Sequence, residues 1–126
     1  MGLSYCMLTL KNPRNPKREA VEVQALADTE TVFLRIPEHI RIQLDLEDEG
    51  EKEVTLADGT KKRVPYVGPI ETRFKNRIAY VGAIVMGDEV LLGAIPMEDM
   101  DLVVLPQQRG VDVNPLNPNF AAAKAK

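Results

Sequence analysis

Short apolar runs, each ended by residues that favour turns, set the strongest limit on how this sequence can fold. Between Ala20 and Ala27, apolar and polar side chains alternate (Val21, Val23 and Ala25 against Glu22 and Gln24). A period of two is typical of a strand with one buried face. Leu3–Leu10 is another strand candidate, and it ends at Asn12-Pro13-Arg14-Asn15-Pro16, because proline cannot donate a ladder hydrogen bond. The pattern therefore predicts an all-β protein.

The rest of the chain continues this pattern, with two helical segments. Strand candidates lie at residues 32–34, 69–74, 78–86, 90–92 and 102–105. Pro37 can open a helix because its missing N–H costs nothing there, and Ile40 and Leu44 then share one face. This predicts one main helix from Pro37 to Leu46 and a short second helix at Pro96–Met100.

A hairpin is predicted around Asp58-Gly59, which lies between two extended arms. Asp-Gly is a strong hairpin signal, because a type I′ turn needs positive φ at both central residues. The acidic run Glu47–Glu51 precedes this hairpin. We expect it to be a solvated loop, since a calcium site needs oxygen ligands at a more regular spacing.

The composition indicates one ordinary globular domain. The chain has 126 residues, of which 44% are hydrophobic and 28% are charged, and its net charge is −3. A domain of this size can bury roughly two-thirds of the surface of its unfolded chain, which is enough for one core. The slight negative charge offers no attraction to nucleic acid or anionic membrane, and no apolar run reaches the ~18 residues of a membrane helix. We predict a single domain over residues 1–126, with no nucleic-acid or membrane partner.

The N-terminus and the single cysteine indicate in which cellular compartment the protein is expected. The N-terminus lacks a basic segment followed by a long apolar stretch, so no secretory signal is predicted. Cys6 is the only cysteine, and its apolar neighbours indicate a buried thiol in a reducing compartment. A cytoplasmic protein is therefore expected. Residues 109–126, with repeated Asn-Pro pairs, are predicted to form an extended tail that can also pack along the body.

One carboxylate is a candidate for chemistry. Asp28 follows an apolar strand, and Thr29, Glu30 and Thr31 come directly after it. In most proteins, Asp-Thr after a strand is a turn with a side-chain cap. The sequence does not predict a zinc site, a serine-hydrolase site or a phosphate-binding loop. It has no Cys/His cluster, no serine–histidine–acid set and no glycine-rich phosphate loop. The single histidine, His39, falls on the surface of the predicted helix, so no metal and no cofactor is predicted.

The order of several short motifs resembles that of retropepsin-like aspartic peptidases. Asp28-Thr29-Glu30-Thr31 precedes an apolar strand, Leu91-Leu92-Gly93 lies much later, and the Asp58-Gly59 hairpin lies between them. That family carries Asp-Thr/Ser-Gly in its catalytic loop, an apolar pair with glycine behind this loop, and a flap over the substrate. The chain also resembles a group of small prokaryotic aspartic proteases of the same clan, above all in Leu91–Pro96 and in the Asn-Pro tail. The resemblance runs from Leu3 to Asn119.

This resemblance implies an all-β closed barrel and a homodimer that hydrolyses peptides or proteins. Asp28 would be the catalytic carboxylate and would meet the Asp28 of a second copy across a two-fold axis. One carboxyl of such a pair is ionised and activates water, while the other is protonated and donates to the peptide carbonyl. Thr29 would support the pair by joining the two loops through its hydroxyl, and Gly93 would allow close backbone approach. Asp58 and Gly59 would form the tip of a substrate-binding flap.

Glu30 stands where the family has glycine, and this departure leaves more than one function open. Its Cβ and its negative charge would crowd the carboxyl pair or force the loop outward, which gives an inactive dimer that binds extended peptide in the same cleft. Alternatively, the side chain points to solvent and the backbone tolerates it, which gives a working aspartic endopeptidase. A third reading is a small structural partner for another protein. All three stay open at the level of sequence.

Overall fold

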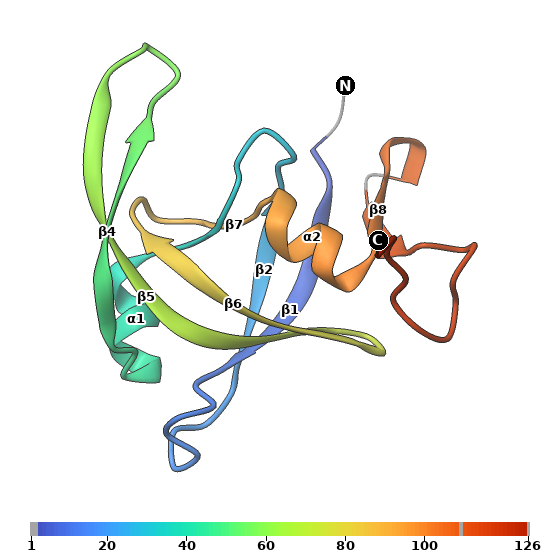
Figure 1. Cartoon of the computed structure of the whole chain (residues 1–126), viewed down its shortest axis with the longest axis horizontal. Helices are drawn as coiled ribbons and strands as arrows, with labels where there is room; N and C mark the ends of the chain where they lie inside the picture. Colours follow the sequence, from blue (N-terminus) through green and yellow to red (C-terminus); the bar gives the residue numbers. More distant parts are fainter. Residues whose placement is uncertain (1–2, 109, 126) are drawn as a thin grey trace.

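Nine strands form one continuous hydrogen-bonded sheet, and two helices connect strands within it (Figure 1). The computed structural model describes residues 3–108 and 110–125. Within these ranges the strands are β1 (Tyr5–Lys11), β2 (Val21–Ala27), β3 (Leu34–Ile36), β4 (Asp48–Thr55), β5 (Lys61–Phe74), β6 (Arg77–Val85), β7 (Val90–Leu92), β8 (Leu102–Leu105) and β9 (Gly110–Val113). The helices are α1 (Glu38–Leu44) and α2 (Ala94–Met100), and a 3₁₀ turn covers Pro106–Gln108.

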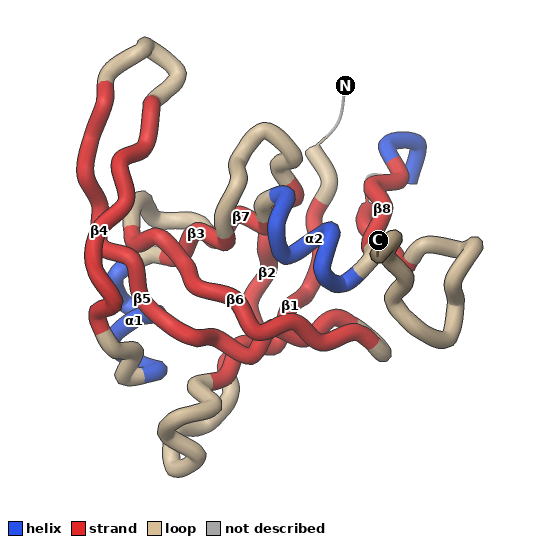
Figure 2. The backbone as a smooth tube through the Cα atoms, viewed as in Figure 1, coloured by secondary structure: helices blue, strands red, loops and turns tan. Residues whose placement is uncertain are grey.

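Six of the strands close into a barrel. Their order is β5-β6-β3-β7-β2-β1, and β1 pairs again with β5 through residues Thr9–Lys11 and Glu71–Arg73. β4 extends the ring at β5, and β9 and β8 extend it at β1. Figure 2 shows the strands wrapping around the barrel while the β4–β5 hairpin reaches beyond it. The prediction of an all-β closed barrel with two helices is confirmed, as far as the architecture of one chain is concerned.

The ring strands turn apolar side chains toward the barrel interior. Along β1, Cys6, Leu8 and Leu10 are buried while Met7 is exposed, as a period of two predicts. The other ring strands add Ala25, Leu34, Ile36, Val67, Ile70, Ala79, Val81, Ala83, Val85, Val90 and Leu92 to the same core. Cys6 is buried on β1, which confirms the prediction of a buried strand thiol, and this burial raises the pKa of the thiol to about 11.

Both helices are seven residues long, so the expected contrast between a main helix and a shorter one is wrong. α1 buries Ile40 and Leu44 as predicted, but it ends at Leu44 rather than at Leu46. Asp45 takes a left-handed conformation there, with φ of 53°, and this ends the helix. The buried Asn12 side chain donates to the carbonyl oxygens of Leu44 and Asp45, both at 3.0 Å. It thereby satisfies acceptors that the helix end leaves free.

The β4–β5 hairpin is longer than predicted and projects from the barrel (Figure 1). The acidic run, predicted to be a solvated loop, is exposed, but from Asp48 onward it belongs to β4. Backbone pairing with residues 61–67 of β5 holds this arm, so its side chains need no buried face. The tip is a three-residue loop rather than a type I′ turn. Leu56 and Thr60 pair at its base, and Gly59 alone of the loop residues has a positive φ, 88°.

The C-terminal region contains a strand that the sequence pattern does not predict. β8 occupies the predicted residues, but it is not the last strand, because β9 pairs with β8 and with β1. The predicted tail, residues 109–126, therefore begins with sheet structure at Gly110, while residues 109 and 126 lie outside the described ranges. After β9, hydrogen bonds hold the tail against Asp101 and Asn76.

Candidate active site

Asp28 is the first residue after β2, and backbone hydrogen bonds fix its place. Its N–H donates to the carbonyl oxygen of Leu92 at 3.0 Å, which extends the parallel pairing of β2 with β7. Its carbonyl oxygen accepts the N–H of Thr31 at 3.1 Å and closes a tight turn. Asp28 is therefore anchored to the rigid end of a strand in the barrel wall.

Two donors from the same turn hold the Asp28 carboxylate. Oδ1 accepts the backbone N–H of Glu30 at 3.0 Å, and Oδ2 accepts the hydroxyl of Thr31 at 2.8 Å. Asp28 and Thr31 are both partly buried; the bond from Thr31 is partly buried as well, whereas the bond from Glu30 is exposed. Because both oxygens are bonded, the plane of the carboxylate is fixed and its remaining lone pairs are available to a ligand.

The turn from Asp28 to Thr31 keeps its hydrogen bonds with glutamate at position 30. The φ of Glu30 lies outside the left-handed region, and its N–H still reaches the Asp28 carboxylate. A Cβ is compatible with that backbone, so the loop is not forced outward. The Glu30 side chain is exposed and lines the groove beside Asp28. Glu30 therefore adds its carboxylate to the groove beside that of Asp28.

Gly93 lets β7 and α2 lie directly beneath this turn. A Cβ on Gly93 would lie 2.2 Å from the carbonyl oxygen of Phe33 and 2.6 Å from that of Thr31, distances at which no side chain fits. Its φ of −86° is ordinary, so the requirement for glycine comes from close contact and not from backbone conformation. The predicted close approach behind the loop is confirmed.

The start of α2 holds the same loop by hydrogen bonds. The N–H groups of Ala94 and Ile95 donate to the carbonyl oxygens of Thr31 and Val32 at 2.7 and 2.9 Å. These donors belong to the first turn of the helix and have no partner within it. Because the two loop carbonyls are used in this way, the strand predicted at residues 32–34 begins only at Leu34.

A groove of about 500 Å³ runs between the Asp28 loop and the β4–β5 hairpin. The loop side contributes Asp28, Glu30, Thr31, Val32 and Phe33, and the hairpin side contributes residues 53–57. The remaining lining residues come from the barrel strands and the turn after β6: Arg35, Ile84, Met86 and Leu91. An open groove of this volume, lined by apolar and charged side chains and bounded by an exposed hairpin, can accommodate an extended peptide.

The structure brings some of the predicted site residues together and leaves others apart. Asp28 lines the groove, whereas Thr29 is exposed and makes no hydrogen bond within residues 3–108 and 110–125. Its predicted role requires a second chain and stays a prediction. Asp58 and Gly59 form the exposed hairpin tip as expected, but the groove is lined by the preceding arm, residues 53–57. Their role in binding substrate also stays a prediction.

Two residues that line the groove, Thr31 and Arg35, are not among the site residues that the sequence predicts. Thr31 bonds the Asp28 carboxylate, and its position three residues after an aspartate is a usable signal for a side-chain turn. Arg35 lines the groove although its strand neighbours Leu34 and Ile36 are fully buried in the core. Strand alternation places Arg35 on the opposite face, but only if the limits of β3 are known.

Charge is unevenly distributed over the groove. Asp28, Glu30 and Glu53 carry negative charge, and Arg35 is the single cation among the described residues that line it. Beside the groove, the Lys52 ammonium lies 5.5 Å from the centre of the Phe33 ring and 4.7 Å from that of Tyr66. Such cation–π contacts tie the base of the hairpin to the loop that follows Asp28.

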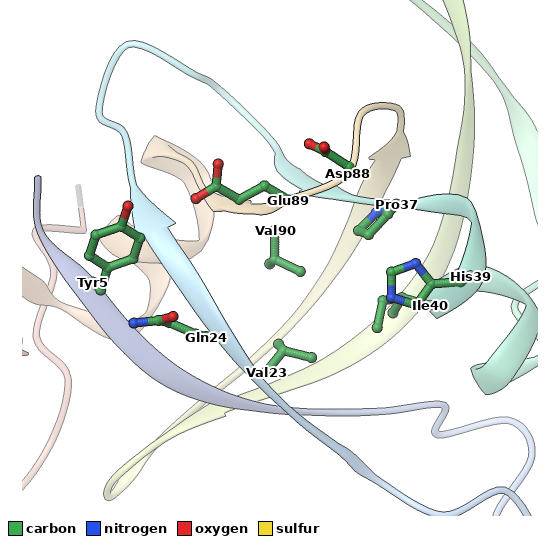
Figure 3. Close-up of a pocket in the computed structure, with 9 residues that line it drawn as sticks. All are labelled: Tyr5, Val23, Gln24, Pro37, His39, Ile40, Asp88, Glu89 and Val90. Carbon is green, nitrogen blue, oxygen red and sulfur yellow. The ribbon is translucent and has the colours of Figure 1, made fainter.

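A second pocket, of about 250 Å³, lies on another part of the barrel (Figure 3). The Tyr5 hydroxyl and the Glu89 carboxylate lie toward one end of it, and His39 lies at the other. His39 is exposed, as predicted for a residue on the helix surface. Within the described part of the chain, no three His, Cys, Asp or Glu side chains are grouped closely enough to hold a metal ion. This pocket contains neither Asp28 nor any other residue of the predicted site.

Comparison with known proteins adds no family to this picture. A scan against protein-family models finds no match, and a search of curated proteins finds none that matches the chain. No helix within the described ranges is both long and apolar enough to span a membrane.

Proposed function

We propose that this chain is a retropepsin-like aspartic endopeptidase that acts as a homodimer. The observation that carries the proposal is the Asp28 carboxylate, which is fixed by the Glu30 N–H and the Thr31 hydroxyl at the edge of the groove. The pairing of β7 behind the loop, the tight fit at Gly93 and the hairpin opposite support it. Each copy supplies one carboxylate held in this way, so the second member of a pair comes from a second chain.

The proposed reaction uses two Asp28 carboxyls that share one proton. Like charges about 3 Å apart cannot both ionise cheaply, so one carboxyl stays protonated at a pH where the other is ionised. The ionised carboxyl takes a proton from water as the water attacks the peptide carbonyl carbon, and the protonated carboxyl donates to the carbonyl oxygen. The tetrahedral intermediate then breaks at the C–N bond as the amine gains a proton. The fixed orientation of each carboxylate reduces the reorganisation that these steps need.

The runner-up function is a catalytically inactive dimer that binds extended peptide. One observation favours it: the Glu30 side chain lines the same groove as Asp28 and adds a negative charge there. A third carboxylate near a shared proton can draw that proton or the catalytic water away from its working position. The groove and the hairpin would still hold a peptide by main-chain bonds.

Cleavage of a broad peptide library between pH 4 and 7 tests the two functions. We expect wild-type cleavage to be blocked by a statine-type inhibitor and to fall about 10³-fold or more in Asp28→Asn, which cannot act as a base. Glu53→Gln is the matched control, since it removes another groove carboxylate away from the Asp28 turn. An Asp28→Asn variant that keeps full activity overturns the proposal. No wild-type activity, with activity gained in Glu30→Gly, assigns the chain to the inactive peptide-binding dimer.

A further inference from the structure

Arg35 lines the groove from β3, and its guanidinium lies against the turn that follows β6. In β3 it alternates with Leu34 and Ile36, both fully buried in the core, so its side chain takes the opposite face. Its cross-strand partners in the sheet are Ile84 on β6 and Leu91 on β7. Both partners line the groove with it. A cation therefore lies between two apolar side chains in this row.

One edge of the Arg35 guanidinium is held by the backbone. Nε and Nη2 donate to the carbonyl oxygen of Glu89 at 3.4 and 3.2 Å. A Cβ on Gly87 would lie 3.1 Å from Cζ and from Nη2 of Arg35, so glycine gives the guanidinium room at this turn. The Glu89 carboxylate lines the other pocket (Figure 3) and forms no ion pair with Arg35 within 4.0 Å. The guanidinium is thus positioned by a neutral acceptor.

Arg35 has no counter-ion within residues 3–108 and 110–125. Among the other arginines in the described ranges, four contact a carboxylate within 4.0 Å (Arg14, Arg41, Arg63 and Arg73), whereas Arg18 and Arg77 form no ion pair. Asp28, Glu30 and Glu53 line the same groove, yet none of them forms an ion pair with Arg35. Because Glu89 takes the Nε and Nη2 edge, both N–H groups of Nη1 and one of Nη2 stay unused. That free edge has the geometry of the two-bond contact with a carboxylate.

We propose that Arg35 binds a carboxylate of the peptide in the groove and so gives the site a preference for an acidic substrate residue. This rests on the proposed function, namely that an extended peptide lies between the Asp28 loop and the hairpin. A partly buried guanidinium without a counter-ion is costly in an apolar setting, and a ligand carboxylate offsets that cost. The three carboxylates at the groove wall limit the preference to the one substrate position that faces β3.

Paired peptides that differ only in Glu against Gln measure this preference. Starting from a cleaved peptide with blocked ends, Glu or Gln is placed at each of the three positions on either side of the cut. We expect one position at which Glu raises kcat/KM about tenfold over Gln, a typical effect of one charge-assisted contact. The same peptides with a free C-terminus show whether a terminal carboxylate can replace the side chain.

Variants of Arg35 assign the preference to this residue. Arg35→Met keeps an apolar stem between Ile84 and Leu91 and should remove the Glu-over-Gln ratio while Gln peptides are still cleaved. Arg35→Lys keeps the charge without the planar fork and should retain part of the ratio, which keeps the test usable if the Met variant folds poorly. Arg73→Met is the control, because Arg73 is exposed and pairs with Glu71 outside the groove. An unchanged ratio in both Arg35 variants overturns the inference.

A binding measurement separates failure of this inference from failure of the proposed function. Fluorescence anisotropy of labelled Glu and Gln peptides is measured on Asp28→Asn, with and without Arg35→Met. If the wild type cleaves Glu and Gln peptides equally at every position, the Arg35 inference is wrong and the peptidase stands. If the wild type cleaves nothing but Asp28→Asn binds Glu peptides about tenfold more tightly through Arg35, the inference stands and the inactive dimer is the better function.

Discussion

Asn12 shows how one buried polar side chain joins distant parts of the chain. It lies in the turn after β1, only 3% exposed, and its amide donates to the carbonyl oxygens of Leu44 and Asp45 at the end of α1. Its own oxygen accepts the N–H of Arg14 at 2.9 Å. Asn12 thus joins the turn after the first strand to the end of the helix, and the Asn15 side chain adds a bond to the Asp45 carboxylate at 3.2 Å.

We therefore expect Asn12→Ala to lower the free energy of unfolding by about 2–3 kcal/mol, since two carbonyls lose their donor and each such bond contributes about 1–1.5 kcal/mol. Urea unfolding measures this as a lower midpoint at constant m-value. Asn15→Ala is the control, because Asn15 is only half-buried and makes one side-chain bond, to Asp45. Equal stability of the two variants would contradict the role assigned to Asn12.

At the scale of elements, the segment after β9 is attached through Asp101, which ends α2 with φ of 54°. Its carboxylate accepts the N–H of Ala122 at 3.1 Å and the side-chain amides of Asn114 and Asn117 at 3.2 and 2.8 Å. These bonds hold the pKa of Asp101 below its ordinary value of 3.8. The group is an acid with a lowered pKa in the folded state. Its contribution to tail docking is therefore present above about pH 4 and is lost as the pH falls through the folded-state pKa.

An NMR titration tests this attachment. The amide of Ala122 and the side-chain NH₂ of Asn117 should shift together, with a midpoint below that of an unstructured aspartate. Asp101→Asn tolerates the left-handed backbone but cannot titrate, so these shifts should lose their pH dependence. Asp99→Asn, on the exposed face of α2, should leave them unchanged. Titration of both signals at the ordinary aspartate value would show that Asp101 does not hold the tail.

The elements that the sequence predicts correctly are those with a local signal. Examples are the period of two in β1 and β2, the Asp58-Gly59 hairpin and the buried face of α1. Each of these signals is formed by residues that lie within a few positions of one another along the chain. β9 has no such signal, because its four residues form a strand only through pairing with β1 and β8. β4 is exposed along nearly its whole length, so its acidic sequence resembles a loop. Its strand structure depends on the backbone of β5.

The same distinction applies to the candidate site. Asp28 and Gly93 are singled out by short motifs; in the structure Asp28 bonds the end of β7 and Gly93 lies against the carbonyls of Thr31 and Phe33. Arg35 cannot be found in this way. The predicted strand at residues 32–34 is shifted by two, because the carbonyls of Thr31 and Val32 bond to α2, and the contact with Glu89 joins residues far apart in the sequence. Long-range contacts, and not local preference, decide which side chain reaches the groove.

For the whole molecule, one exposed apolar pair lies next to the Asp28 turn. Val32 is 51% exposed and Ile95 is 44% exposed, and a hydrogen bond from the Ile95 N–H to the Val32 carbonyl oxygen keeps the two residues together. The proposed dimer brings two Asp28 turns face to face, so the surface around these turns is where a second copy would cover apolar area. A stable dimer buries about 800 Å² or more on each partner, which requires such neighbours to take part.

We expect the wild type to sediment as a dimer at micromolar concentration and Ile95→Lys to sediment as a monomer, because the variant places a charge in the covered surface. Peptidase activity should be lost with the dimer and should return in part at high protein concentration, since dissociation and not the chemistry is affected. Ile78→Lys is the matched control: Ile78 is 41% exposed on β6 and lines no part of the groove, so it should change neither size nor activity. A wild-type monomer whose cleavage rate per chain does not depend on protein concentration would exclude a shared pair of Asp28 carboxyls, because half of that pair would then be missing from the working enzyme.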